Sequence, residues 1–231
     1  MIVDANNPNF EQLLAAAKKL ASLLDQIAFV GGWVTGLLVT DPGAAPIRAT
    51  LDIDAIVEIG SYAEFTLLEN RLRDLGFRES RDMVCRWTHE DMILDLMPTD
   101  SSILGFTNRW YRPALQNAQQ IRIEQYEIRA ITAPYFLATK LEAFRGRGRD
   151  DYRMSHDLED VIAVIDGRAE ITKEVSDAQP ELRQYLSNQF LDLLASHDFL
   201  GSLPGHLLPG DASQRRAGIV IERISQLTIE S

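Results

Sequence analysis

The sequence predicts an α+β protein in which an α/β sheet half is followed by a helical half. In the first half, short apolar runs typical of strands are separated by glycines, a proline-containing loop and amphipathic helical stretches. After residue 132 the strand pattern stops and apolar residues recur at helical spacing. We therefore expect a mixed-sheet domain at residues 1–132 and a helical domain at residues 133–231.

The pattern of the first half predicts each element in turn. Leucines and alanines at helical spacing predict a helix over residues 10–26, and residues 27–38 read as a strand that breaks at Gly31-Gly32 and continues as a helix from Trp33. The next elements expected are a loop at 40–49, a strand within 48–60, a helix at 62–75, two strands around a tight turn at 89–91, and two short strands near 121–131.

The second half predicts only helices. Pro134 is expected near the start of a helix that reaches Arg145, and Ser155 is a candidate N-cap for a helix that ends near Gly167. Further helices are expected near residues 178–195 and 211–228.

Composition limits the classes of function. The formal net charge of -11 argues against general adhesion to nucleic acid, because phosphate binding relies on clustered basic side chains. Cys85 is the only cysteine, which excludes an intrachain disulfide and a cysteine-based zinc site. The first residues lack the pattern of a signal peptide, and no apolar run approaches the ~18 residues of a membrane span. We expect a cytoplasmic protein without a membrane partner.

Three carboxylates in apolar strands are the candidate catalytic residues. Asp52 and Asp54 alternate with apolar residues and so point to one face of their strand. Such a pair is unfavourable unless a cation compensates it, and a divalent metal ion is the simplest such cation. Asp95 lies in the otherwise uncharged run "MILDLMP". The alternatives are a solvated strand face for the first two and a turn-capping role for Asp95.

The glycine pair supplies a candidate phosphate site. A strand that runs through Gly31-Gly32 into a helix leaves backbone N–H groups free at the helix start, with no side chain in the way. Alone, such a pair is usually only a turn. Its place about twenty residues before the Asp-x-Asp strand matches a loop that grips a triphosphate while the carboxylates hold Mg²⁺ or Mn²⁺.

These motifs together resemble the DNA polymerase beta-like nucleotidyltransferase superfamily, and within it the AbiEii and MenT type of toxin–antitoxin and phage-defence systems. "FVGGWVTGLL" resembles the glycine-pair motif, "RATLDID" fits the Arg-x-Ser/Thr-x-Asp-x-Asp element, and "LDLMPT" resembles the strand with the third carboxylate. The resemblance covers roughly Ile27 to Gly167. It departs from the family where Gly32 replaces the serine of many relatives, and the tail after residue 167 matches no motif.

The resemblance implies a fold, a reaction and a set of residues. It implies a mixed sheet followed by a helical domain that completes a nucleotide cleft, and magnesium- or manganese-dependent transfer of a nucleoside monophosphate from an NTP to an acceptor hydroxyl, with release of pyrophosphate. Asp52, Asp54 and Asp95 would hold the metal ions, and Asp95 would help to deprotonate the acceptor. The nucleotide would be bound by Gly31, Gly32, Arg48, Thr50, Lys140 and Asp157.

The helical-half candidates also have structural interpretations. Lys140 borders an apolar helical stripe, where it could donate to a phosphate or simply extend its charge into solvent. Asp157 lies in a first helical turn, where a carboxylate is favoured by the helix dipole in any case. A basic run is either a solvated helix end or a guide for phosphates; it comprises Arg145, Arg147, Arg149 and Arg153.

Several functions stay open at the level of sequence. The resemblance implies tRNA, a small antibiotic-like molecule or a protein as the acceptor, and a cognate antitoxin as a partner. The alternatives are a catalytically silent nucleotide- or protein-binding module of the same fold, and a glycosyltransferase that uses Asp-x-Asp with a diphosphate sugar. The glycosyltransferase interpretation expects a nucleotide-binding α/β half before the aspartates, and only about fifty residues precede them.

Overall fold

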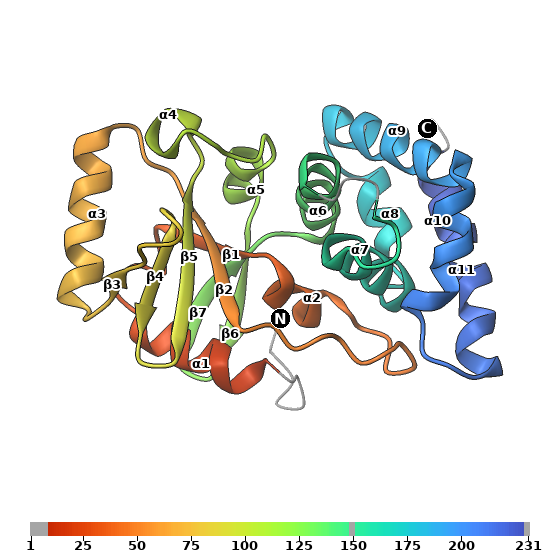
Figure 1. The fold of residues 1–231 in the computed structure, drawn as a ribbon, viewed down its shortest axis with the longest axis horizontal. Helices are drawn as coiled ribbons and strands as arrows, with labels where there is room; N and C mark the ends of the chain where they lie inside the picture. The colour runs from red at the N-terminus through yellow and green to blue at the C-terminus, as the bar shows by residue number, and fades with distance from the viewer. Residues whose placement is uncertain (1–8, 148–150, 229–231) are drawn as a thin grey trace. The chain divides into compact units, whose positions relative to one another are not determined.

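The computed structural model describes residues 9–147 and 151–228, and in these residues it is an α+β protein, which confirms the predicted fold class (Figure 1). The chain divides into two compact units. The sheet unit takes the described residues up to Leu37 together with Arg48–Thr132. The helical unit takes Leu38–Ile47 together with the described residues from Ala133 onward.

One mixed sheet forms the centre of the sheet unit (Figure 1). Within the described residues it has seven strands in the order β3-β4-β5-β2-β1-β7-β6. Two neighbouring pairs, β2 with β5 and β1 with β7, are parallel, and the other pairs are antiparallel. The strands are β1 (Ile27–Val30), β2 (Asp52–Val57), β3 (Arg78–Glu79), β4 (Arg86–His89), β5 (Met92–Pro98), β6 (Gln119–Ile123) and β7 (Tyr126–Ala130).

Among the described residues the sheet unit has five helices: α1 (Phe10–Lys19), α2 (Gly32–Leu38, whose last residue already belongs to the helical unit), α3 (Tyr62–Asp74), α4 (Ser101–Leu104) and α5 (Tyr111–Gln116). The helix α1 packs against β7, and α5 packs against β2. Ser61 caps α3, where its hydroxyl accepts a hydrogen bond from the Glu64 N–H at 3.2 Å. The central strand β1 is buried along its whole length, as its run of apolar residues predicts.

The predicted helix over residues 10–26 is too long. The helix α1 ends at Lys19, and the chain then continues in turns. In these turns the N–H of Leu23 donates to the Leu20 carbonyl and the N–H of Gln26 donates to the Leu23 carbonyl. Both leucines remain buried, so the tighter turns keep the apolar side chains in the core without a continuous helix.

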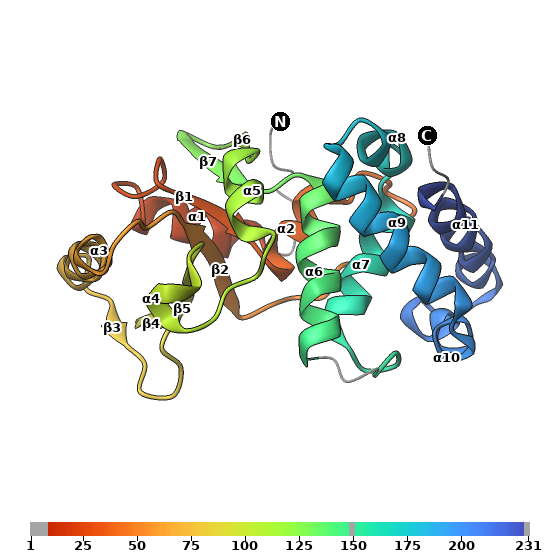
Figure 2. The ribbon, with the colours of Figure 1, turned by 90° about the horizontal axis from the view of Figure 1, so that it is seen from above.

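The helical unit contains the helices α6 (Ala133–Arg147), α7 (His156–Gly167), α8 (Ile171–Ser176), α9 (Pro180–Ala195), α10 (His197–Ser202) and α11 (Asp211–Leu227), with a short 3₁₀ turn, η1 (Leu203–His206). The helices α7 and α9 both pack beside α6 (Figure 2). Ser155 caps α7 as predicted, with its hydroxyl accepting from the Leu158 N–H. None of the helices in the described part of the chain has the length and apolar character to cross a bilayer.

The segment Leu38–Ile47 joins the helical unit at the end of α7. The N–H groups of Thr40 and Asp41 donate to the Gly167 carbonyl at 2.8 and 2.9 Å. Arg216 connects the same region, because it binds the buried carboxylate of Asp166 through Nε and the carboxylate of Asp41 through Nη2, each at 2.7 Å. The charges and the carbonyl at the helix end are thus satisfied within one small cluster.

Replacement of this arginine should destabilise the helical unit. We expect Arg216→Met to lower the free energy of unfolding by about 3 kcal/mol, because Asp166 would keep a buried charge without its guanidinium. The exposed neighbour Arg215 is the matched control, and Arg215→Met should change it by less than about 0.5 kcal/mol. Chemical denaturation of both variants measures the difference, and equal values would contradict the role of the cluster.

Candidate functional site

The three predicted carboxylates lie together on the sheet unit. In the parallel pair of β2 and β5, Asp54 stands directly opposite Asp95, so their side chains point to the same face. Asp52 lies two residues earlier on β2 and shares that face. Like charges placed directly opposite each other destabilise a sheet, so this face requires a positive charge.

Arg86 on β4 supplies a positive charge to this face. Its Nε and Nη2 donate to Oδ1 and Oδ2 of Asp95 at 2.8 and 2.7 Å, and the same Nη2 donates to Oδ2 of Asp52 at 2.9 Å. Hydrogen bonding to Asp95 raises the pKa of the Arg86 guanidinium, and the charges of both aspartates act in the same direction. Arg86 therefore bridges the two strands that carry the aspartates.

Arg86 was not among the residues predicted from the sequence, although the pattern of the hairpin contained a signal for it. The turn at Glu90 and Asp91 joins β4 to β5, and from it the antiparallel register places Arg86 opposite Asp95. Counting backward from the predicted turn would therefore have paired the only arginine of this hairpin with the third carboxylate.

The glycine pair forms a close approach to Asp54. Gly31 has a φ of +70°, in the left-handed region that favours glycine. A methyl group on Gly31 would lie 1.9 Å from Oδ2 of Asp54, a distance that atoms cannot adopt. Gly32 begins α2, and a methyl group there would make ordinary contacts with Thr50 at 3.5 Å. The turn thus brings the main chain directly against the carboxylate.

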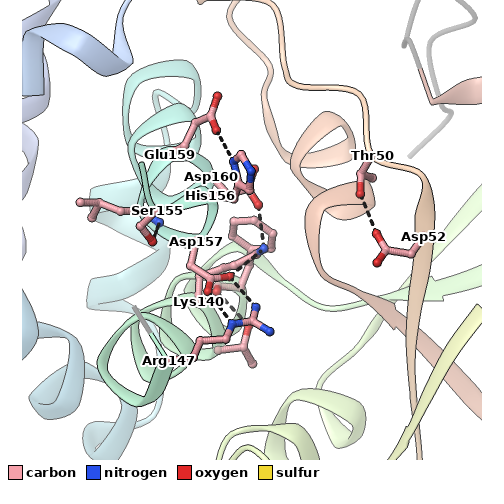
Figure 3. Close-up of polar contacts among 12 residues, drawn as sticks. Thr50, Asp52, Lys140, Arg147, Ser155, His156, Asp157, Glu159 and Asp160 are labelled. Carbon is pink, nitrogen blue, oxygen red and sulfur yellow. Dashed lines mark hydrogen bonds and ion pairs between the residues drawn. The ribbon is translucent and has the colours of Figure 1, made fainter. Parts of the chain in front are cut away.

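Thr50 and Arg48 lie beside the same turn. The Thr50 side chain is buried, and its hydroxyl donates to Oδ1 of Asp52 at 3.0 Å (Figure 3). The Arg48 Nη2 atom lies 3.6 Å from the methyl position of Gly32. The sheet unit therefore brings together seven predicted site residues, namely Gly31, Gly32, Arg48, Thr50, Asp52, Asp54 and Asp95.

The other two predicted residues form a buried charge cluster in the helical unit. Lys140 Nζ lies 3.3 Å from Oδ1 of Asp157 and 2.6 Å from Oδ2 of Asp160 (Figure 3). The guanidinium of Arg147 donates to both oxygens of Asp157 at 2.9 and 3.0 Å. Lys140 is thus a buried partner of two carboxylates and does not extend into solvent, and Asp160 is a member of the cluster that the sequence did not reveal.

The cluster sets the ionisation of Asp157. Burial acts to raise the pKa of the Asp157 carboxyl, but the hydrogen bonds from Arg147 and the charge of Lys140 outweigh burial. The pKa therefore lies below its ordinary value, and the carboxylate is ionised at neutral pH. Of the predicted basic run, Arg147 belongs to this cluster, Arg145 pairs with Asp192, and Arg149 lies outside the described residues.

The chemistry of the sheet-unit donors fits a divalent ion. Three carboxylates on one face supply the hard oxygen donors that Mg²⁺ and Mn²⁺ prefer. In this structure Asp52 and Asp95 pair with Arg86, and in residues 9–147 and 151–228 no three His, Cys, Asp or Glu side chains are arranged to hold a metal ion. Burial raises the pKa of the neighbouring Cys85 thiol to about 11, aided by the charge of Asp95, so Cys85 is not a thiolate donor at neutral pH.

Comparison with known proteins shows the fold. No protein-family model matches the chain, and no curated protein matches it in sequence. An antigenic nucleotidyltransferase-like protein from Paracoccidioides brasiliensis superposes with a TM-score of 0.53 and 18% identity, over 85% of this chain and 94% of that one.

Two Helicobacter pylori structures give lower scores. JHP933 has a TM-score of 0.47 at 16% identity, over 98% of this chain and 93% of its own. A candidate nucleotidyltransferase has a TM-score of 0.44 at 13% identity, over 97% of this chain and 96% of its own. The likeness to the Paracoccidioides protein, together with the mixed sheet, shows that the chain has a nucleotidyltransferase-like fold.

Proposed function

We propose that the protein is a nucleotidyltransferase that moves a nucleoside monophosphate from an NTP to an acceptor hydroxyl and releases pyrophosphate. The observation that carries the proposal is the opposition of Asp54 and Asp95 on parallel strands, with Asp52 on the same face and the Gly31 turn against Asp54. Carboxylates placed this close together are energetically unfavourable. Such unfavourable clusters of ionisable groups are typical of functional sites.

The chain's own residues have defined parts in the proposed reaction. The acceptor oxygen forms a bond to the α-phosphorus while the bond to the pyrophosphate oxygen breaks, and Asp95 accepts the hydroxyl proton. Arg48 and Thr50, which lie beside Gly32, would contact phosphate oxygens in this reaction. Asp52, Asp54 and Asp95 are the side chains that would hold Mg²⁺ or Mn²⁺, and a bound ion would neutralise charge on the triphosphate.

The finer assignment rests on the sequence resemblance. By that resemblance the protein is of the AbiEii and MenT type, acts on tRNA, and has a cognate antitoxin as a partner. A small hydroxylated molecule and a protein are the other acceptor classes. The phosphate-binding roles of Lys140 and Asp157 stay predictions, because both side chains lie within the ion-pair cluster of the helical unit.

Labelling of cellular acceptors tests the proposed activity. Purified protein is incubated with each α-labelled NTP, with Mg²⁺ or Mn²⁺, and with RNA, protein and small-molecule fractions of a cell extract. We expect one fraction to gain label. We expect Asp54→Asn to reduce the transfer by roughly 10²–10⁴-fold, because Asp54 lies between Asp52 on its own strand and Asp95 on β5.

Glu58 offers the matched control for this substitution. Glu58 follows the end of β2 and is exposed beside Arg112, away from Asp52, Asp54 and Asp95. Glu58→Gln should therefore transfer label like the unmodified protein. Equal transfer by Asp54→Asn and the unmodified protein would contradict the proposed activity.

The second candidate is a catalytically silent binding module of the same fold. The observation that favours it is Arg86, whose guanidinium pairs with both Asp52 and Asp95. A silent module should bind no divalent ion at these carboxylates and transfer no label with any NTP. An active enzyme requires that a metal ion can take the place of Arg86.

A further inference from the structure

We propose that Arg86 is the counter-cation of the carboxylate face, which is formed by Asp52, Asp54 and Asp95. A divalent metal ion must displace Arg86 from Asp52 and Asp95 in order to bind. This inference rests on the proposed function, since it concerns the metal ion of the same site. It assigns Arg86 a positioning role, in which the arginine sets how readily the carboxylates accept the ion.

The geometry of the ion pairs places two cations in competition for the same oxygens. The Nη2 atom of Arg86 lies 2.9 Å from Oδ2 of Asp52 and 2.7 Å from Oδ2 of Asp95, so these two oxygens converge on one positive group. A metal ion shared by the two carboxylates would need the oxygens that now accept from Arg86. A guanidinium and a divalent ion repel each other at such short range, so both cannot occupy this position.

Arg86 also lies at a position from which its side chain can move away from Asp52 and Asp95. It is the first residue of β4 and follows a connection in which residues 81–84 are exposed. About a quarter of its side chain is exposed (26%), whereas only 8% of the Asp95 side chain is exposed. A long side chain at the start of a strand can therefore turn toward solvent while the carboxylate stays in position.

The same arrangement lowers the electrostatic cost of the carboxylates when no metal ion is bound. Without a compensating cation, the opposed carboxylates of β2 and β5 would repel each other and weaken the central strand pair. Arg86 offsets part of that cost when no metal ion is bound, because it pairs with Asp95 on β5 and Asp52 on β2. Metal affinity is then lower than three free carboxylates would give, because each ion that binds must first break the hydrogen bonds to Arg86.

Titration with Mn²⁺ in the absence of nucleotide tests the proposal. The proteins compared by calorimetry are the unmodified chain, Arg86→Met and the control Arg112→Met, which removes an arginine paired with Asp100 elsewhere on the sheet unit. We expect Arg86→Met to bind Mn²⁺ at least about tenfold more tightly, because charge-assisted hydrogen bonds no longer compete. Arg112→Met should bind Mn²⁺ as the unmodified protein does.

Thermal unfolding with and without Mn²⁺ separates competition from a merely structural role. Competition predicts a lower Tm for metal-free Arg86→Met and a larger increase of Tm on addition of Mn²⁺ than in the unmodified protein. A structural role predicts the same loss of Tm at every Mn²⁺ concentration and no gain in affinity. Unchanged or weaker Mn²⁺ binding by folded Arg86→Met would therefore overturn the proposal and leave the proposed activity intact.

Two further results are decisive. If neither the unmodified protein nor Arg86→Met binds Mn²⁺, the competition and the metal-dependent activity both fail. If Arg86→Met does not fold, Arg86→Lys keeps the charge but loses the bidentate hydrogen bonds to Asp95. Arg86→Lys should then bind Mn²⁺ more tightly than the unmodified protein, and equal affinity would overturn the proposal.

Discussion

Gly31→Ala should destabilise the sheet unit strongly and disrupt the carboxylate face. Two costs add, because the left-handed backbone at Gly31 costs an alanine roughly 1–2 kcal/mol and forced overpacking costs about 1–3 kcal/mol. The overpacking arises because the new methyl group would lie 1.9 Å from Oδ2 of Asp54. We expect a loss of about 2–5 kcal/mol in the free energy of unfolding, measured by chemical denaturation.

The adjacent glycine provides the control. Gly32 starts α2, and a methyl group there would meet Thr50 at 3.5 Å and Arg48 at 3.6 Å, which are ordinary contacts. Gly32→Ala should therefore leave the stability unchanged or raise it by up to about 1 kcal/mol, since alanine restricts the unfolded chain. Equal stabilities of the two variants would contradict the close approach of the main chain to Asp54.

Lys140→Met should produce the largest loss of stability in the helical unit. Lys140 lies 2.6 Å from Asp160 and 3.3 Å from Asp157, and both carboxylates are buried. Asp157 keeps its hydrogen bonds from Arg147, whereas Asp160 loses its 2.6 Å ion pair with Lys140. We expect the free energy of unfolding to fall by about 3–5 kcal/mol, the range for breaking a buried ion pair by removal of one partner.

Two comparisons identify the cause of this loss. The double variant Lys140→Met/Asp160→Asn should regain much of the stability, because it also removes the buried charge. Arg145→Met, on the same helix but with an exposed side chain, should cost about 0–1 kcal/mol. A double variant as unstable as Lys140→Met would show that packing, and not charge, accounts for the effect.

The effect of Lys140→Met should depend on pH. The pKa of Asp157 is lower in the folded protein than its ordinary value, so its ion pairs contribute stability above the pKa of the unfolded state, which is about 3.9. That contribution is lost as the pH falls through the lower folded-state pKa. The difference in unfolding free energy between the unmodified protein and Lys140→Met should therefore be smaller near pH 3 than at pH 7.

The order of the elements could be predicted from sequence because each signal is local. Apolar alternation, the glycine pair and the hairpin turn at Glu90 predicted the central strands, and Ser155 predicted the start of α7. The end of α1 could not be predicted, since leucine spacing continues through turns that still bury Leu23. The short elements β3, α4, α5, α8 and α10 carry too few residues for a periodic signal.

The carboxylate face could be predicted only in part. Strand alternation placed Asp52 and Asp54 on one side, and an apolar run singled out Asp95. Their opposition across β2 and β5 depends on the pairing of strands that are far apart in the sequence. The same holds for Lys140, whose spacing next to an apolar stripe does not show that Asp157 and Asp160 lie on the facing helix.

By itself, the sequence determined the α+β class, the order of the central elements, and the residue types available to the site. These features depend on neighbouring residues along the chain, namely on hydrophobic periodicity, turn residues and charged residues within apolar runs. The tertiary structure alone decided which charges meet. Arg86 lies between Asp52 and Asp95 because antiparallel and parallel pairings converge on β5, and Lys140 is enclosed because α6 and α7 pack together. Such pairings offset the unfavourable electrostatic free energy of buried like charges. That free energy depends on contacts that form only when the strands and helices pack together.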